Sequence, residues 1–144
     1  VVLHLPVPHP PAVYDRATST LAPASRRISY VDSLALADHV LGEIRSGMEA
    51  KGLWDRSAVI VSADHGWRAN LWRGGPQWTA EDEALPADDP VAVPFLVKLP
   101  GQQTTATWGQ PFPTVRTRAL VEKLLGGAPV PEDEVSLLLW VFGG

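Results

Sequence analysis

Residues 59–68 read VIVSADHGWR, an apolar run that leads directly into an acid, an imidazole and a glycine. The β-branched residues within 58–63 predict a short buried strand. Buried charges are costly unless they are paired or bound to metal, so the side chains that follow need an explanation. Either Asp64 and Gly66 form an ordinary turn at the strand exit, or the strand delivers Asp64 and His65 to a site.

The segment before this strand predicts a long helix. Apolar residues at three- and four-residue spacing extend over 28–50, where Ser29 would cap the start and Gly52 would end the helix. We expect this helix to be scaffold, with Asp38 and His39 clear of any site.

Two further apolar segments, 1–5 and 91–99, predict strands, and 115–125 predicts a second helix. The stretches between these elements are rich in proline or lack a steady period, and they predict loops. This order of elements indicates an α/β fold, in which helices cover the faces of a layered sheet. Strands 1–5 and 58–63, joined by the long helix, would form a right-handed βαβ crossover.

The crossover would bring four polar side chains together. In open α/β sheets, sites gather beyond the carboxyl ends of the strands. His4 and His9 lie at the end of the first predicted strand, and Asp64 and His65 lie at the end of the next. We therefore expect them to converge at one edge of the sheet. Asp and His are ligands that zinc and manganese prefer, so a metal site is predicted there.

Each of these assignments has a simpler alternative. His4, on a predicted buried strand, fits a core histidine, and His9, in a proline-rich loop, fits a solvent-exposed one. Arg68 and Arg73 fit either bidentate binding of an anionic substrate or ordinary surface ion pairs. The six tryptophans fit packing in the core or in loops.

Composition narrows the class of protein. The 144 residues suffice for one domain, and a formal charge of -4 with a pI near 5.5 argues against a nucleic-acid-binding surface. The absence of cysteine excludes disulfides, thiolate metal sites and a cysteine nucleophile within the chain. The longest apolar run, 135–142, is far shorter than the roughly 20 residues of a membrane span. The chain opens inside a strand pattern, so we expect it to be part of a longer protein.

Four segments carry a resemblance to a known family: LHLPVPHPP, YVDSLALADHVLGEI, VIVSADHG and VPFLVKLPG. Their order resembles the sulfatase-like branch of the alkaline phosphatase superfamily, which includes sulfatases, phosphonate monoester hydrolases, and the phosphoethanolamine and glycerol-phosphate transferases of bacterial envelopes. The resemblance implies that residues 1–144 are the C-terminal portion of a catalytic domain with an alkaline-phosphatase-like fold, and that the domain is incomplete in this chain.

The resemblance also implies roles for single residues. Asp64 and His65 match the metal-binding pair that follows a strand in this family, and His9 matches the histidine of its H-x-P loop. His4 matches a histidine that some transferases carry five residues earlier. The implied cofactor is a divalent metal, either zinc, manganese or calcium, and the implied substrate is a sulfate or phosphate ester. The site residues are therefore expected to be three metal ligands and three substrate-binding residues: Asp64, His65 and His9; His4, Arg68 and Arg73.

The chain also departs from the pattern of the family. An acidic metal ligand and a Ser, Thr or formylglycine nucleophile are expected before Val1, so no residue here is assigned as nucleophile, and Thr18, Ser19 and Thr20 do not match its position. The absent N-terminal half of the domain is thus an expected partner. No histidine follows His65, where the transferases carry one.

Two functions follow from the resemblance. The first is a part of a metal-dependent hydrolase or transferase that acts on sulfate or phosphate esters and has little activity as this chain alone. The alternative is a catalytically degenerate domain that binds a ligand or a partner. The resemblance implies an extracytoplasmic or periplasmic domain of a bacterial membrane protein, although this chain has no predicted span.

Overall fold

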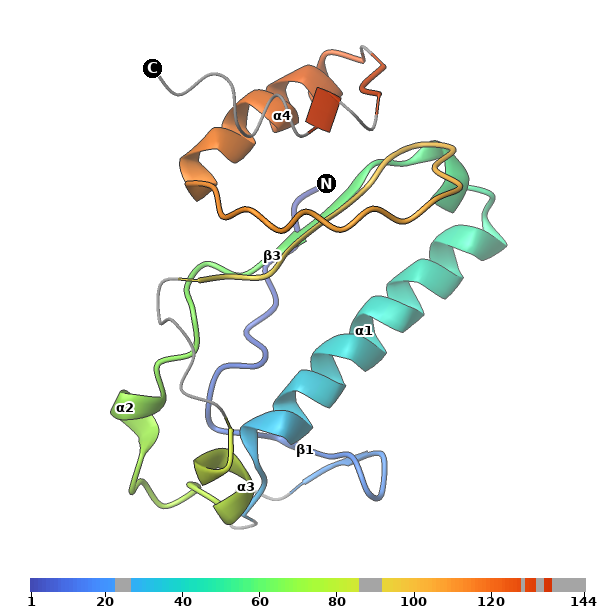
Figure 1. The fold of residues 1–144 in the computed structure, drawn as a ribbon. Coiled ribbons are helices and arrows are strands. Elements are labelled where there is room, and N and C mark those ends of the chain that lie inside the picture. Colours follow the sequence, from blue (N-terminus) through green and yellow to red (C-terminus); the bar gives the residue numbers. More distant parts are fainter. Residues whose placement is uncertain (23–26, 86–91, 128, 132–133, 136–144) are drawn as a thin grey trace. The chain divides into compact units, whose positions relative to one another are not determined.

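The computed structural model describes residues 1–22, 27–85, 92–127, 129–131 and 134–135 (Figure 1). Most of the apolar run 135–142 lies outside these residues. The chain divides into two compact units: the first comprises Val1–Lys51 and Ser62–Pro94, and the second comprises Gly52–Val61 and Phe95–Gly144.

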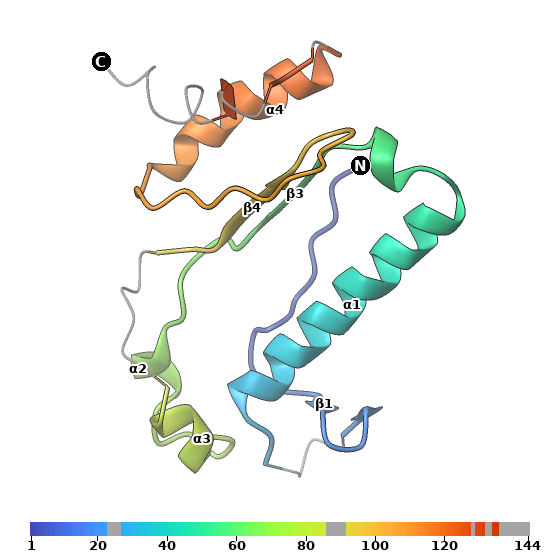
Figure 2. The same ribbon diagram turned by 45° about the vertical axis from the view of Figure 1, so that its right-hand side comes forward.

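Helix α1, Tyr30–Ala50, is the longest element of the first unit (Figures 1 and 2). The Ser29 hydroxyl accepts the backbone N–H of Asp32 at 3.3 Å, and the Asp32 carboxylate accepts the backbone N–H of Ser29 at 3.0 Å. This reciprocal capping box satisfies donors that a helix start would otherwise leave unpaired. The helix stops before Gly52, which adopts a φ of +63°. The helix predicted over 28–50, its cap and its stop are therefore confirmed.

Gly47 and Gly52 form a matched pair for a stability test. A Cβ at either position would meet no heavy atom within 4 Å, so neither substitution would cause a clash. Gly47→Ala, inside α1, should raise the free energy of unfolding by about 0.5–1 kcal/mol. Gly52→Ala should lower it by about 1–2 kcal/mol, because a side chain is strained in the left-handed conformation. Urea denaturation measures both, and changes of the same sign would contradict this account.

A short hairpin precedes α1, in a stretch that the sequence predicted as loop. Strand β1, Tyr14–Asp15, pairs antiparallel with β2, Thr20–Leu21, with Tyr14 opposite Leu21 and Asp15 opposite Thr20. The Asp15 carboxylate accepts the N–H of Ala17 at 3.0 Å, which is the local bond of an Asx turn. Helix α1 packs against β1, where the ring of His39 stacks on that of Tyr14.

Two single-turn helices lie in the stretch after the Asp-His pair, which the sequence also predicted as loop. They are α2, Ala69–Trp72, and α3, Ala80–Glu83. Thr79 caps α3 with a second capping box: its hydroxyl accepts the N–H of Asp82 at 3.2 Å, and the Asp82 carboxylate accepts the Thr79 N–H at 2.9 Å. We call residues 67–83, which include α2 and α3, loop 67–83.

The second unit is built on a pair of strands that lie side by side in Figures 1 and 2. Strand β3, Val59–Ser62, pairs with β4, Phe95–Lys98. The N–H of Gly101, beyond the end of β4, donates to the carbonyl of Asp55, before the start of β3, at 2.7 Å, so the two strands run antiparallel. The strands predicted over 58–63 and 91–99 are confirmed with shorter bounds, and residue 91 lies outside the described residues.

Lys98 fastens this strand pair to the 3-10 turn η1, Trp54–Arg56. Its ammonium donates to the carbonyl oxygens of Trp54 and Ser57, the latter at 3.0 Å, and lies 5.2 Å from the centre of the Trp54 ring. The half-buried charge is therefore matched by carbonyl oxygens and by a cation–π contact.

The helix predicted over 115–125 is also confirmed. The 3-10 turn η2, Thr114–Arg116, leads into α4, Thr117–Leu125. Leu120 is fully buried on this helix. Gly127 follows its C-terminus with a φ of +73°, as the predicted glycine stop requires.

The predicted strand over 1–5 is wrong. Residues 1–5 are not in a strand, and Val1, Val2 and Leu3 are exposed. A strand exists only where a neighbour satisfies its backbone groups, and the described residues form two two-stranded sheets, neither of which includes residues 1–5. The βαβ crossover expected from this strand is therefore not formed either. The chain is mixed α/β.

Each unit has a small apolar core. Ala12, Tyr14 and Ile28 are buried in the first unit, and Leu99 and Leu120 are buried in the second. The first unit also buries three carboxylates, which belong to Asp15, Asp32 and Asp82.

Across the residues described, none of the helices has the length and apolar character that a membrane span needs.

Candidate functional site

The chain bends where β3 ends, at Asp64 and His65. In a regular strand, adjacent side chains point to opposite faces. Here the bend leaves Asp64 Oδ1 3.9 Å from His65 Nε2, so the carboxylate and the imidazole face the same region. Asp64 is exposed and His65 is partly exposed, with 77% and 37% of their side chains accessible to solvent. The turn interpretation and the ligand interpretation of this segment are therefore compatible.

Both histidines predicted as metal ligands, His65 and His9, have one ring nitrogen fixed by the backbone. Nδ1 of His65 lies 2.9 Å from the carbonyl oxygen of Gly66, and Nδ1 of His9 lies 2.5 Å from that of Pro10. A carbonyl oxygen only accepts, so Nδ1 carries the proton in each ring. In the neutral form of each ring, the lone pair therefore lies on Nε2, which is the arrangement of a metal-ligating histidine whose other nitrogen donates to a carbonyl.

His9 belongs to the same unit as the Asp-His pair and contacts loop 67–83. Its ring meets the ring of Trp72 edge to face, with centroids 5.4 Å apart and planes at 85°. Trp72 is the last residue of α2, which begins only four residues after His65. The contact therefore joins the proline-rich loop to the segment that follows Asp64.

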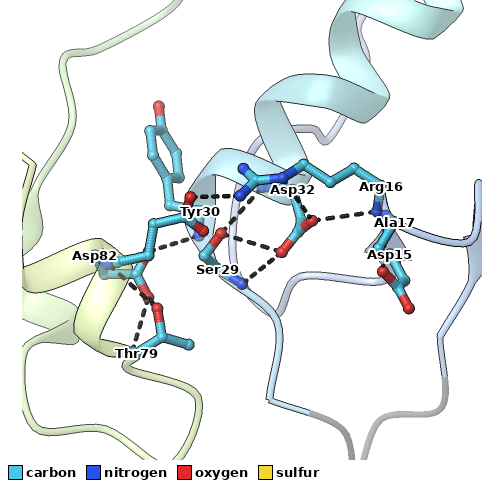
Figure 3. A network of polar contacts seen from close by, with 9 residues as sticks. Asp15, Arg16, Ala17, Ser29, Tyr30, Asp32, Thr79 and Asp82 are labelled. Carbon is cyan, nitrogen blue, oxygen red and sulfur yellow. Dashed lines mark hydrogen bonds and ion pairs between the residues drawn. The ribbon is translucent and has the colours of Figure 1, made fainter.

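A buried carboxylate links loop 67–83 to α1 (Figure 3). Asp82 accepts the hydroxyl and the backbone N–H of Thr79, at 2.7 and 2.9 Å. Its other oxygen accepts the backbone N–H of Tyr30, the first residue of α1, at 2.6 Å. One side chain thus satisfies donors at the starts of two helices that lie far apart in the sequence.

Arg16 makes a second link between the same elements. Its backbone N–H donates to Asp32 at 3.2 Å, and its guanidinium lies 3.6 Å from that carboxylate and contacts Glu81. Hydrogen bonds from Ser29 and Arg16 lower the pKa of the Glu81 carboxyl. Positive charge from the hairpin thus lies between acidic groups of α1 and α3.

Tyr30 also anchors an aromatic cluster. The ring of Trp67 stacks on that of Tyr30 with centroids 3.7 Å apart, and the ring of Trp78 lies parallel to that of Trp67 at 6.3 Å. Burial raises the pKa of the Tyr30 phenol above its ordinary value. The guanidinium of Arg73 lies 5.8 Å from the centre of the Trp78 ring.

The structure does not gather the three predicted metal ligands into one cluster. Asp64 and His65 face the same region, and His9 contacts the loop that follows them. Over the described ranges, no three His, Cys, Asp or Glu side chains lie close enough together to hold a metal ion, so the expected three-ligand cluster is not assembled. The roles of Asp64, His65 and His9 as ligands stay predictions.

The three residues predicted to bind substrate have different surroundings. His4 is exposed and is not on a strand, so its interpretation as a core histidine is wrong. Arg68 is exposed at the start of α2. Arg73 makes two contacts of 3.1 Å with the carboxylate of Glu83, so its alternative as a surface ion pair is confirmed.

The cap predicted at Ser29 is confirmed, but the sequence did not predict that Asp32, Thr79 and Asp82 take part in the contacts between loop 67–83 and α1. The Ser29-to-Asp32 and Thr79-to-Asp82 spacings are both Ser/Thr-x-x-Asp and signal a reciprocal cap, so each box was locally detectable. The bond from Tyr30 to Asp82 and the contact of Trp72 with His9 join distant segments, and no local pattern predicts them.

A comparison with protein families returned a match over most of the chain. The family model described as Sulfatase matches residues 1–121. The match includes the proline-rich loop with His9, all of α1 and the Asp64-His65 pair. A search of curated proteins and a search of solved structures found no match.

Proposed function

This chain belongs to the sulfatase family, and from that premise we propose that it is part of a metal-dependent enzyme that hydrolyses or transfers sulfate or phosphate esters. Family membership indicates an ester hydrolase-like function with a sulfate ester substrate, and it implies an alkaline-phosphatase-like fold. Metal dependence, the wider range of esters and the transferase reaction are the finer parts of the proposal. We also propose that a layered sheet of this fold forms around β3 and β4 in the intact protein.

The observation that carries the proposal is the arrangement after β3. A bend brings the Asp64 carboxylate and the His65 Nε2 to the same side, and backbone bonds at Nδ1 leave Nε2 of both His65 and His9 with a lone pair. A carboxylate and two neutral imidazoles are donors that suit zinc or manganese. In the residues that the structure describes, these three side chains are not gathered closely enough to hold an ion by themselves, so we propose them as part of a metal shell that is completed in the intact protein.

The residues of this chain would act mainly by binding and charge. When bound, a divalent cation supplies Lewis-acid stabilisation of the negative charge that develops on ester oxygens. Asp64 would contribute the compensating negative charge, and its exposure leaves it accessible to a cation. The exposed guanidinium of Arg68 suits bidentate binding of a sulfate or phosphate group.

Chelation tests the metal requirement directly. The intact protein should hydrolyse 4-nitrophenyl sulfate or 4-nitrophenyl phosphate, and dialysis against EDTA should reduce turnover by at least about tenfold, as expected when a bound metal activates the reaction. Adding zinc or manganese back should restore it. Full turnover by protein shown by elemental analysis to be metal-free would contradict the proposal, as would failure to hydrolyse any sulfate or phosphate ester.

A further inference from the structure

The position of the proton on the His65 ring depends on the peptide group that joins Gly66 to Trp67. The carbonyl oxygen of Gly66 lies 2.9 Å from Nδ1 of His65. Because a carbonyl oxygen only accepts, this contact favours the neutral ring with its proton on Nδ1. A peptide group is planar, so the Gly66 carbonyl and the Cα of Trp67 belong to one rigid unit. Whatever fixes Trp67 therefore also helps to fix the acceptor that His65 uses.

Trp67 is held by its ring against the start of a long helix. The ring stacks on that of Tyr30 with centroids 3.7 Å apart and planes at 17°, and Tyr30 is the first residue of the 21-residue helix α1. The ring of Trp78 lies parallel to that of Trp67 at 6.3 Å. Gly66 is buried but has no side chain. Of the two residues that share the peptide group, only Trp67 can therefore anchor it by side-chain packing.

The indole N–H of Trp67 shows that the faces of the ring, and not a hydrogen bond, determine where the ring lies. Nε1 is buried and has no hydrogen-bond partner in the part of the chain that the structure describes. A buried donor without an acceptor lowers stability, so the stack with Tyr30 has to offset this cost. Phenylalanine has a ring face but no N–H, so it would keep the stack without the unpaired donor.

We propose that Trp67 is a positioning residue for His65, which acts through the Gly66 carbonyl. Its stack on Tyr30 holds this carbonyl at Nδ1, so that the neutral ring keeps its lone pair on Nε2. Nε2 is the nitrogen that lies 3.9 Å from Asp64 Oδ1. The inference goes beyond the proposed function, because it concerns the imidazole of the free protein and holds whatever the Asp-His pair binds. Trp67 itself is assigned no contact with a substrate.

Nitrogen-15 NMR of histidine side chains, in the intact protein labelled at histidine, tests this inference without any ligand. At a pH of about 8.5, above the ordinary histidine pKa of about 6.5, the ring nitrogens report the ratio of the two neutral tautomers. The His65 signal is identified by its loss in His65→Ala, and in the parent it should show the proton on Nδ1. Trp67→Leu should lower the ratio of Nδ1–H to Nε2–H tautomer by about threefold to tenfold, the factor that corresponds to loss of an aromatic pair. Trp67→Phe should stay within about twofold of the parent.

Two further variants separate positioning from a general effect on the loop. Tyr30→Leu removes the other half of the stack but keeps the backbone N–H that Asp82 accepts, so it should reproduce the change at His65. Trp72→Leu, in the same loop, removes a ring that contacts His9 and should leave the His65 signal unchanged.

Three results would overturn the proposal. The first is an unchanged His65 tautomer in Trp67→Leu, and the second is an equal change in Trp67→Phe. The third is an equal change at His39, which stacks on Tyr14 in β1, because a shift shared by both histidines would show that Trp67 acts through the whole fold. If Trp67→Leu does not fold, the tautomer ratio in Tyr30→Leu decides between these outcomes.

Discussion

In the intact protein, Asp64→Ala and His65→Ala should each lower kcat/KM for the preferred ester by more than about 100-fold. Replacing outer partners of metal ligands typically costs about 10–100-fold in metal affinity or activity, so loss of a ligand should exceed that range. Both side chains face one region at the exit of β3, where Asp64 offers an exposed carboxylate and His65 an Nε2 lone pair. Steady-state kinetics and the zinc content of each purified variant measure the effect.

The chain supplies its own control for this experiment. The tripeptide Ala-Asp-His occurs twice, at 63–65 and again at 37–39 within α1. Asp38 and His39 are exposed, and the ring of His39 stacks on that of Tyr14 in β1, not on a residue at the exit of β3. Asp38→Ala and His39→Ala should therefore change turnover by less than about twofold, as surface substitutions away from special features usually do. A loss at His39 comparable to that at His65 would show that the site had been assigned to the wrong pair.

Asp82→Ala should lower the free energy of unfolding by about 2–4 kcal/mol. Loss of a helix cap costs about 1 kcal/mol, and hydrogen bonds to a charged group contribute about 1.5–3 kcal/mol. Asp82 is 5% exposed and accepts donors from both Thr79 and Tyr30, so its removal leaves several donors without a partner. Chemical denaturation monitored by tryptophan fluorescence suits the measurement, because Trp67 and Trp78 lie in the same loop.

Two comparison substitutions, Glu83→Ala and Asp82→Asn, show whether the buried hydrogen bonds of Asp82 cause this loss of stability. Glu83→Ala removes a carboxylate one position later, where the partners Arg73 and Trp78 bind an exposed side chain. It should cost less than about 1 kcal/mol, as exposed ion pairs do. Asp82→Asn retains one carbonyl oxygen and should recover part of the stability. Equal losses in Glu83→Ala and Asp82→Ala would mean that the buried bond to Tyr30 contributes no more to stability than an exposed ion pair does.

The elements that could be predicted from the sequence are those with local signals. Helix α1 has a steady apolar period, a serine at its cap and Gly52 at its end, and all three signals lie within or beside the helix. Strand β3 was recognised from a run of β-branched residues. The single-turn helix α3 was missed because one turn shows no period, although Thr79 and Asp82 have the spacing of a cap.

The elements that could not be predicted depend on partners far away in the sequence. Residues 1–5 have the composition of a strand, but composition does not supply a neighbour for their backbone groups. Asp64 and His65 were identified as a pair from the sequence, whereas their shared direction results from a bend at the strand exit. The proton on Nδ1 of each histidine is set by a carbonyl oxygen whose position only the folded backbone defines.

The bond between Tyr30 and Asp82 has a consequence for the order of folding events. Helix α1 can start without residue 82, because Ser29 and Asp32 cap it within one turn. The backbone N–H of its first residue, Tyr30, gains its partner only when Asp82, 52 positions later in the chain, is in place. Contacts of such long sequence separation form after local ones, because the intervening chain must first be closed into a loop. During synthesis, α1 would therefore emerge as a capped but incompletely bonded helix, and the arrival of α3 would complete it. Substitutions at this bond should then speed unfolding more than they slow folding, so that the lifetime of the native state depends on the last contact to form.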